Sequence, residues 1–331
     1  MKKYIFVITF LLILSGCDSK KSKIDDIDLQ ISIERLDQEL YNLRNDSLCQ
    51  KLDTVREQYG DFFEFYNTGI INIGESRHQL YCDFLHRFLS HTIVDSAYQK
   101  VNEIYADDNW LNEELTSIFK HYKFYFPESK IPRIITYVSG FNEALMLTDN
   151  AVGIGLDNFL GSDFSIYTKL GKAVYQQYNM RPEYVPVACL QTWLIGEFPE
   201  NLAQENTLLA KMIYEGKILY ALKQCFPKKS FDQIIGYKPE QLQWCLNNEQ
   251  QMWQQLIEQQ LLYTTTPFVI QKYTGEAPFT AGFSQESPGK AANWLGFRIV
   301  ENYVKRSGCS LEELMLMPDS KTILKEAKYN P

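Results

Sequence analysis

The chain has a single stretch with the pattern of β-strands, and this limits how it can fold. Residues 131–138 are mostly β-branched or aromatic, and a Ser139-Gly140 turn follows them. Farther along, Asp149-Asn150 separates the apolar runs 143–148 and 151–156, which is typical of a β-hairpin. We therefore expect one small sheet of about three or four strands in the middle of the chain.

The sequence on both sides of this stretch carries apolar residues at helical spacing. The pattern predicts helices across 33–126, ended by Pro127, and again from 167 onward. The fold class is therefore α+β, predominantly helical with one small central sheet. In the second helical block the expected helices cover 202–225, 239–263 and 288–306, with Gly308 just past the last one.

The first residues have the features of an export signal. Lys2 and Lys3 precede an apolar run over 4–14, and Leu-Ser-Gly then leads into Cys17. The run is too short to span a bilayer, which takes about 20 apolar residues. We expect 1–16 to be a signal peptide and Cys17 to be the site of lipid attachment.

The remaining chain is expected to form one globular domain on a tether. Residues after Cys17 are polar and charged, which favours a flexible lipidated tether. The predicted divisions are a tether over 17–28 and a domain over 29–331, made of a helical part 29–127, the sheet 131–157 and a second helical part 165–331.

The net charge and the distribution of apolar residues indicate what kind of partner the chain has. The net charge of −8 argues against a nucleic-acid partner, which would require a basic surface. A second long apolar segment is missing, so we expect a soluble body held on a membrane by its lipid, on the periplasmic or outer-membrane side of the envelope.

Histidine and cysteine give little support for catalysis. No histidine follows His121, so most of the chain has no imidazole for a Ser–His or Cys–His pair. His78, Cys82 and His86 are spaced to share a helix face and bind a metal, but no further ligand is evident and we expect no metal there. Besides Cys17, the cysteines are expected to be small buried hydrophobic residues, although disulfides are possible outside the cytoplasm. These residues are Cys49, Cys82, Cys189, Cys225, Cys245 and Cys309.

The expected helix 202–225 contains a glutamate, Glu215, that can be compared with the glutamate of a zinc-binding H-E-x-x-H helix. In zinc peptidases an H-E-x-x-H helix places two zinc-binding histidines on one face, with the glutamate as general base. Here Glu215 occupies the glutamate position, while Tyr214 and Ile218 occupy the histidine positions. Neither residue is a useful zinc ligand, so we expect no metal and no cofactor. Asp157 and Glu249 are candidate cleft carboxylates that could join Glu215 in a rebuilt hydrolytic site.

Several motifs together resemble those of the gliding-motility lipoprotein family GldB. The similarity covers nearly the whole chain and includes the residues around Cys17. The motifs are 155–161 (GLDNFLG) with Tyr167, 180–184 (MRPEY), 213–217 (IYEGK), Gly289, 293–296 (NWLG), Ile299, Val300, Tyr303 and 328–331 (KYNP).

The resemblance implies a cell-envelope lipoprotein that serves a gliding-motility or linked secretion machine. It also implies a distant similarity to zinc peptidases, which would give a zincin-like architecture with Glu215 on the former active-site helix and the 131–157 hairpin along the cleft edge. Since the metal ligands are lost, we expect no enzyme but a protein that binds an unidentified envelope protein. Two alternatives remain open: a hydrolase with a rebuilt active site, and a lipoprotein that binds a glycan or small molecule.

Overall fold

The computed structural model describes residues 23–44, 48–201, 203 and 205–331. The predicted signal peptide, Cys17 and the first part of the predicted tether lie outside this range. From Lys23 onward the tether is part of the folded body, because Ile24 is buried and the Lys120 amine donates a hydrogen bond to the Asp25 carbonyl at 3.5 Å. Ordered packing therefore begins before residue 29.

The central sheet has the order β1-β2-β4-β3. Its β1–β2 and β2–β4 pairs are parallel, and its β3–β4 pair is antiparallel. The expected hairpin at Asp149-Asn150 is confirmed, since Leu147 pairs with Val152 across this turn. The strands are β1 (Ile33–Arg35), β2 (Arg133–Tyr137), β3 (Leu145–Leu147) and β4 (Ala151–Gly155).

The first strand contradicts the expectation of a helix from residue 33. Ile33–Arg35 forms β1, and the helix that follows it begins only at Leu36. Long-range contacts hold this short strand in place. The Ile33 N–H donates to Asn112 Oδ1 at 2.9 Å, and Arg133 forms an ion pair with Glu34 at 2.6 Å. A local periodicity cannot reveal partners that lie far along the chain, which explains why a helix was predicted from residue 33.

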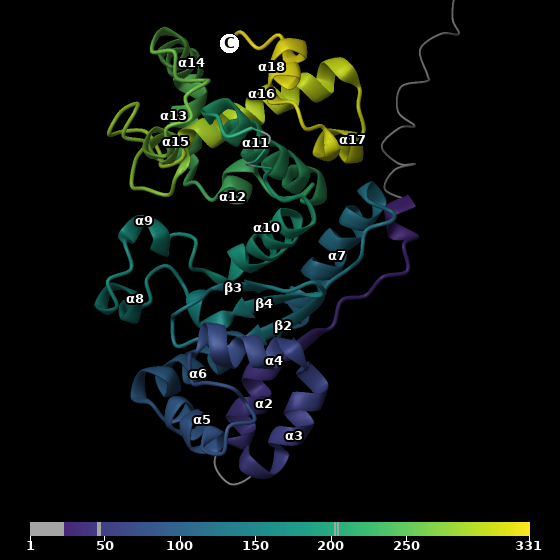
Figure 1. Cartoon of the computed structure of the whole chain (residues 1–331), viewed down its shortest axis with the longest axis vertical. Coiled ribbons are helices and arrows are strands. Elements are labelled where there is room, and N and C mark those ends of the chain that lie inside the picture. The colour runs from purple at the N-terminus through teal and green to yellow at the C-terminus, as the bar shows by residue number, and fades with distance from the viewer. Residues whose placement is uncertain (1–22, 45–47, 202, 204) are drawn as a thin grey trace, which may run out of the picture.

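Helices cover both faces of the sheet. In Figure 1 the helices α2–α6 lie below the sheet, while α10 and the C-terminal helices lie above it. Every residue of β4 is buried, as expected for a strand covered on two faces. The N-terminal helices are α2 (Leu36–Leu43), α3 (Leu48–Tyr59), α4 (Asp61–Phe65), the π-helix η1 (Tyr66–Ile70), α5 (Tyr81–Leu89), α6 (Thr92–Ile104) and α7 (Asn109–Tyr125).

The chain after the sheet is helical, as expected, but with different boundaries. Thr207 caps the helix expected over 202–225, so its observed start is Leu208. The helix expected over 239–263 is broken at Asn248 into α13 and α14. The elements are η2 (Leu156–Asn158), α8 (Ser165–Lys169), α9 (Val174–Gln177), η3 (Pro182–Tyr184), α10 (Val185–Glu197), α11 (Leu208–Cys225), α12 (Phe231–Ile235), α13 (Pro239–Asn247), α14 (Glu249–Glu258), α15 (Pro267–Thr274), α16 (Ala291–Ser307), α17 (Leu311–Leu316) and α18 (Ser320–Ala327).

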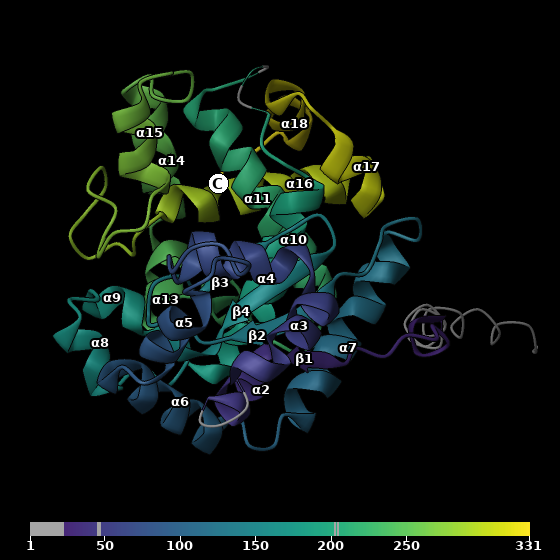
Figure 2. The ribbon, with the colours of Figure 1, turned by 60° about the horizontal axis from the view of Figure 1, so that its bottom comes forward.

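The C-terminal part is built around the contact between α11 and α16, which both views show side by side (Figures 1 and 2). The contact is made by glycines. A Cβ atom added to Gly216 would overlap the backbone of Gly296, and one added to Gly296 would overlap the Met212 carbonyl. The two helix backbones therefore touch at a point where neither helix has room for a side chain.

We predict that Gly296→Ala destabilises the protein although alanine favours a helix by about 1 kcal/mol over glycine. The added methyl group forces the two backbones apart, so the free energy of unfolding should fall by about 3 kcal/mol. Urea unfolding measures this change.

Gly196→Ala in α10 is the matched control. There the nearest atoms that a Cβ would meet belong to the movable Leu147 side chain. This variant should keep or slightly raise the stability of the protein. Equal stability of both variants would contradict backbone contact at the α11–α16 crossing.

Candidate functional site

Glu215, which the sequence led us to compare with a peptidase general base, is held in an ion pair. Glu215 lies on α11 and contacts Lys211, one turn earlier on the helix, with a distance of 2.9 Å from Lys211 Nζ to Glu215 Oε1. Lys211 also contacts Glu200, which follows α10, at 2.8 Å. Because Lys211 bridges two carboxylates, Glu215 has a local structural partner.

The residues at the two histidine positions have packing roles. Ile218 is fully buried in the core. The Tyr214 hydroxyl is also buried and has no hydrogen-bond partner among the described residues, and burial raises the pKa of Tyr214 above its ordinary value. An alkyl side chain cannot bind zinc, and a neutral phenol is a poor ligand for it.

A pocket of about 230 Å³ lies beside Tyr214 and Lys217. Lys217 is only 8% exposed, and its amine donates a hydrogen bond to the Met317 carbonyl. Burial lowers the pKa of Lys217 to about 8, so a fraction of this amine is neutral at neutral pH. The pocket is lined by Phe198, Pro199, Glu200, Asn201, Glu205, Ala210, Ile213, Tyr214, Lys217, Met315, Leu316, Met317, Pro318 and Ser320.

The lining of this pocket differs from the cleft that the resemblance implies. The 131–157 hairpin contributes no residue to it, and the loops after α10 and α17 form its walls instead. Lys211 and Lys217 were not predicted as site residues. The four-residue spacing of Lys211 and Glu215 was a signal for their ion pair, whereas the burial of Lys217 depends on the distant Met317 segment.

Asp157 is completely buried at the end of the sheet, where it holds a turn. Its carboxylate accepts hydrogen bonds from the Ser139 N–H and hydroxyl, both at 3.0 Å, and from the Phe141 N–H at 2.5 Å. Gly140 and Phe141 both have left-handed backbone conformations, with φ of 69° and 66°. The carboxylate therefore fixes a strained turn after β2.

Glu249 belongs to a third, separate network. Its Oε1 atom accepts hydrogen bonds from the Arg298 guanidinium at 2.9 Å and from the Tyr329 hydroxyl at 2.7 Å. Asp157, Glu215 and Glu249 thus each have their own partners. In the part of the chain that the structure describes, no group of three or more His, Cys, Asp and Glu side chains is arranged to hold a metal ion.

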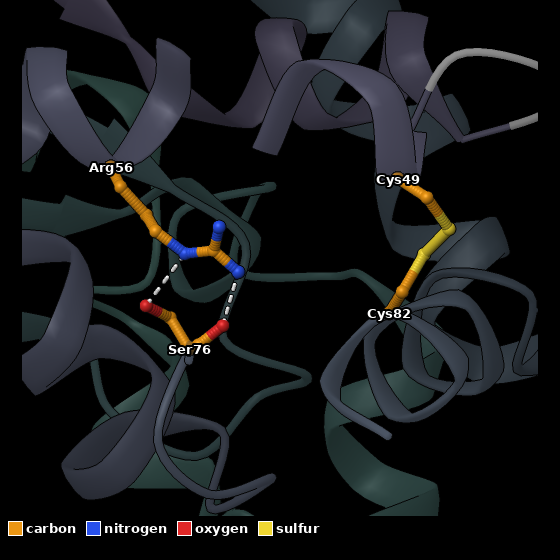
Figure 3. Close-up of a disulfide and its surroundings, with 4 residues drawn as sticks. All are labelled: Cys49, Arg56, Ser76 and Cys82. Atoms are coloured by element: carbon orange, nitrogen blue, oxygen red, sulfur yellow. Dashed lines mark hydrogen bonds between the residues drawn. A yellow bond between two sulfur atoms is a disulfide. The ribbon is translucent and has the colours of Figure 1, made fainter. Parts of the chain in front are cut away.

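The spacing of His78, Cys82 and His86 does not produce a shared helix face. His78 precedes the start of α5 at Tyr81, and Cys82 forms a disulfide with Cys49 on α3 (Figure 3). The expectation that Cys49 and Cys82 are isolated small hydrophobic residues was therefore wrong. It was correct for Cys189, Cys225 and Cys245, which are buried and lie outside the disulfide, while Cys309 is partly exposed.

Asp157 leads to a prediction about the pH dependence of stability. Burial raises the pKa of Asp157 from 3.8 to about 6, against the lowering effect of its hydrogen bonds. Between these values the folded state binds a proton that the unfolded state has lost, so stability falls as the pH rises from about 4 to 6. Relative to Asp157→Asn, the natural protein should lose roughly 3 kcal/mol across this range.

Urea unfolding at several pH values between 4 and 6 tests this expectation. Asp149→Asn, which removes an exposed carboxylate in the β3–β4 turn, is the control for a general loss of negative charge. A difference between Asp157→Asn and the natural protein that does not change with pH would contradict a titrating Asp157.

Comparisons with known proteins agree with the export signal and with the motifs. Residues 1–17 match the prokaryotic membrane lipoprotein lipid attachment site, which supports a membrane anchor at Cys17. Among the described residues, no helix is long and apolar enough to cross a bilayer. No match was found among curated proteins or among solved structures. Residues 17–331 match the model of the gliding motility protein GldB, so the chain belongs to this lipoprotein family.

Proposed function

We propose that this chain is a non-catalytic lipoprotein of the cell envelope that supports a gliding-motility or linked secretion machine by binding a protein partner. The lipid places the folded body at a membrane surface, where a partner complex can assemble around it. The family gives the link to motility. Two parts of this proposal are that the chain binds a protein partner and that it has no catalytic activity.

The observation that carries the proposal is the use of α11 as a packing element. Gly216 makes the backbone contact with α16, Ile218 is buried in the core, and Glu215 is paired with Lys211. A general base must reach a reacting proton, and a zinc site needs at least three protein ligands. Glu215, Gly216 and Ile218 make structural contacts within the protein instead.

A zincin-like origin of the fold is part of the same proposal. It rests on Glu215 and on the position of its helix after a small sheet whose edge strand, β3, is antiparallel. In this reading the helix was retained because its packing holds the C-terminal part together. The catalytic ligands were replaced by residues that pack.

The two alternatives have less support. A rebuilt hydrolytic site would need Glu215 to act with Asp157 or Glu249, and each of these carboxylates has its own hydrogen-bonding partners. A glycan or small-molecule site beside Tyr214 would be small, because its volume of about 230 Å³ is below the range of roughly 300–1,000 Å³ that is usual for ligand sites.

We predict that Glu215→Gln supports gliding as well as the natural residue does. The experiment expresses the chain in a gliding bacterium that lacks its own family member, and it measures cell movement and the amount of protein in membranes. Glutamine has nearly the same shape, and the partly exposed ion pair with Lys211 stabilises the fold by no more than about 1 kcal/mol.

Two controls accompany this variant. The natural chain must restore gliding, and Cys17→Ala should lose both membrane attachment and gliding because no lipid can be added. Loss of gliding in Glu215→Gln with normal amounts of membrane-bound protein would contradict the proposal and would favour a hydrolase.

A further inference from the structure

A larger groove lies on the opposite side of the sheet from α11. Its volume is about 620 Å³, within the range of roughly 300–1,000 Å³ that is usual for binding sites. It is formed by the end of η1, α5, the start of α6, the turn after β2, and α8. Its lining residues are Ile71, Asn72, Ile73, Phe84, Arg87, Phe88, His91, Ile93, Val94, Gly140, Asn142 and Leu170.

The walls of this groove are mainly apolar and partly open to solvent. Ile93 is 39% exposed and Leu170 is 41% exposed, while Phe84 and Phe88 are half-buried. Large apolar side chains that are exposed together in a concave surface are typical of a site that binds another molecule.

The formally charged side chain that lines the groove, Arg87, is basic, although the chain as a whole is acidic. Arg87 and His91 are exposed lining residues, and no lining residue is an aspartate or glutamate. Among the described residues, Arg87 has no carboxylate within ion-pair distance. The groove is therefore complementary to a ligand that is both apolar and negatively charged.

Several contacts hold the walls of the groove in a fixed shape. Asp157 fixes the turn that contains Gly140, and the Asn142 amide donates to the Ile70 carbonyl at 3.2 Å. Figure 3 shows Arg56 donating to Ser76, which anchors the loop between η1 and α5. A preformed groove loses little conformational entropy when it binds a ligand.

The Cys49–Cys82 disulfide in the same figure ties α5 to α3. Because α5 supplies Phe84, Arg87 and Phe88, this bond fixes the helix that contributes both apolar and charged groups to the groove.

We propose that this groove binds an apolar peptide segment of a partner protein, with a carboxylate of that segment paired to Arg87. The side-chain amides of Asn72 and Asn142 lie at the same groove, and each donates one N–H to the Ile70 carbonyl. Their second N–H and their amide oxygen can pair with peptide C=O and N–H groups, for which a lipid acyl chain has no counterpart. This inference rests on the proposed function and deepens it, since it gives the binding surface and the chemistry of the partner.

A displayed library of random twelve-residue peptides tests the inference. The target is the mature chain with Cys17→Ser, which carries no lipid, and its disulfide is kept oxidised. The selected peptides should be rich in aromatic or aliphatic residues and should contain aspartate or glutamate. Arg87→Glu should weaken the binding of synthetic copies at least 10-fold, and Ile93→Asp should do the same.

Matched variants distinguish a specific effect of Arg87 on peptide binding from the effect of a changed net charge. Lys305→Glu makes a similar change of charge at an exposed position at the end of α16, and it should leave binding unchanged. A peptide whose acidic residues are replaced by lysine should lose binding to the natural protein and regain it with Arg87→Glu.

Four results would overturn the inference. Selected peptides could lack an acidic preference, or their binding could be insensitive to Arg87→Glu. A library that yields no binder would also contradict the inference, and binding of oleate or anionic vesicles through Arg87 would then assign the groove to lipid. If Arg87→Glu removes peptide binding but gliding is unaffected, the groove is not the partner site, and the non-catalytic function still stands.

Discussion

The backbone contact between Gly216 and Gly296 is the constraint on which the C-terminal part of the structure depends. It fixes α11 against α16, and so it also fixes the direction of every side chain on α11. Tyr214 lines the small pocket, Ile218 enters the core, and Glu215 is left beside Lys211. Gly216, the neighbour of Glu215, thus has a packing explanation that needs no catalytic role.

Much of the fold could be predicted from local patterns. The predicted turn at Asp149-Asn150 and the predicted helix end before Gly308 are both confirmed. Both could be predicted because glycine and asparagine have strong backbone preferences. The strand Ile33–Arg35 was missed, since its parallel partner β2 lies far along the chain. The break at Asn248 was also missed, because no proline or glycine marks it.

The candidate site was harder to predict, because the partner of a charged residue often comes from a distant segment. The sequence singled out Asp157 and Glu249, but it could not show that Ser139 and Phe141 bind the first and that Arg298 and Tyr329 bind the second. The apolar groove was missed for the same reason. Its residues come from separated segments, and none of these segments carries a motif.

The most direct measurement of the central claim is the zinc content of the purified mature chain with Cys17→Ser, after incubation with zinc and dialysis. Since Tyr214 and Ile218 stand where an H-E-x-x-H helix would carry its two zinc-binding histidines, we predict no stoichiometric zinc. We also predict a thermal midpoint that a chelator does not change. One zinc per chain, lost in Glu215→Gln or His78→Ala, would contradict the account and restore the hypothesis of a metal-dependent hydrolase.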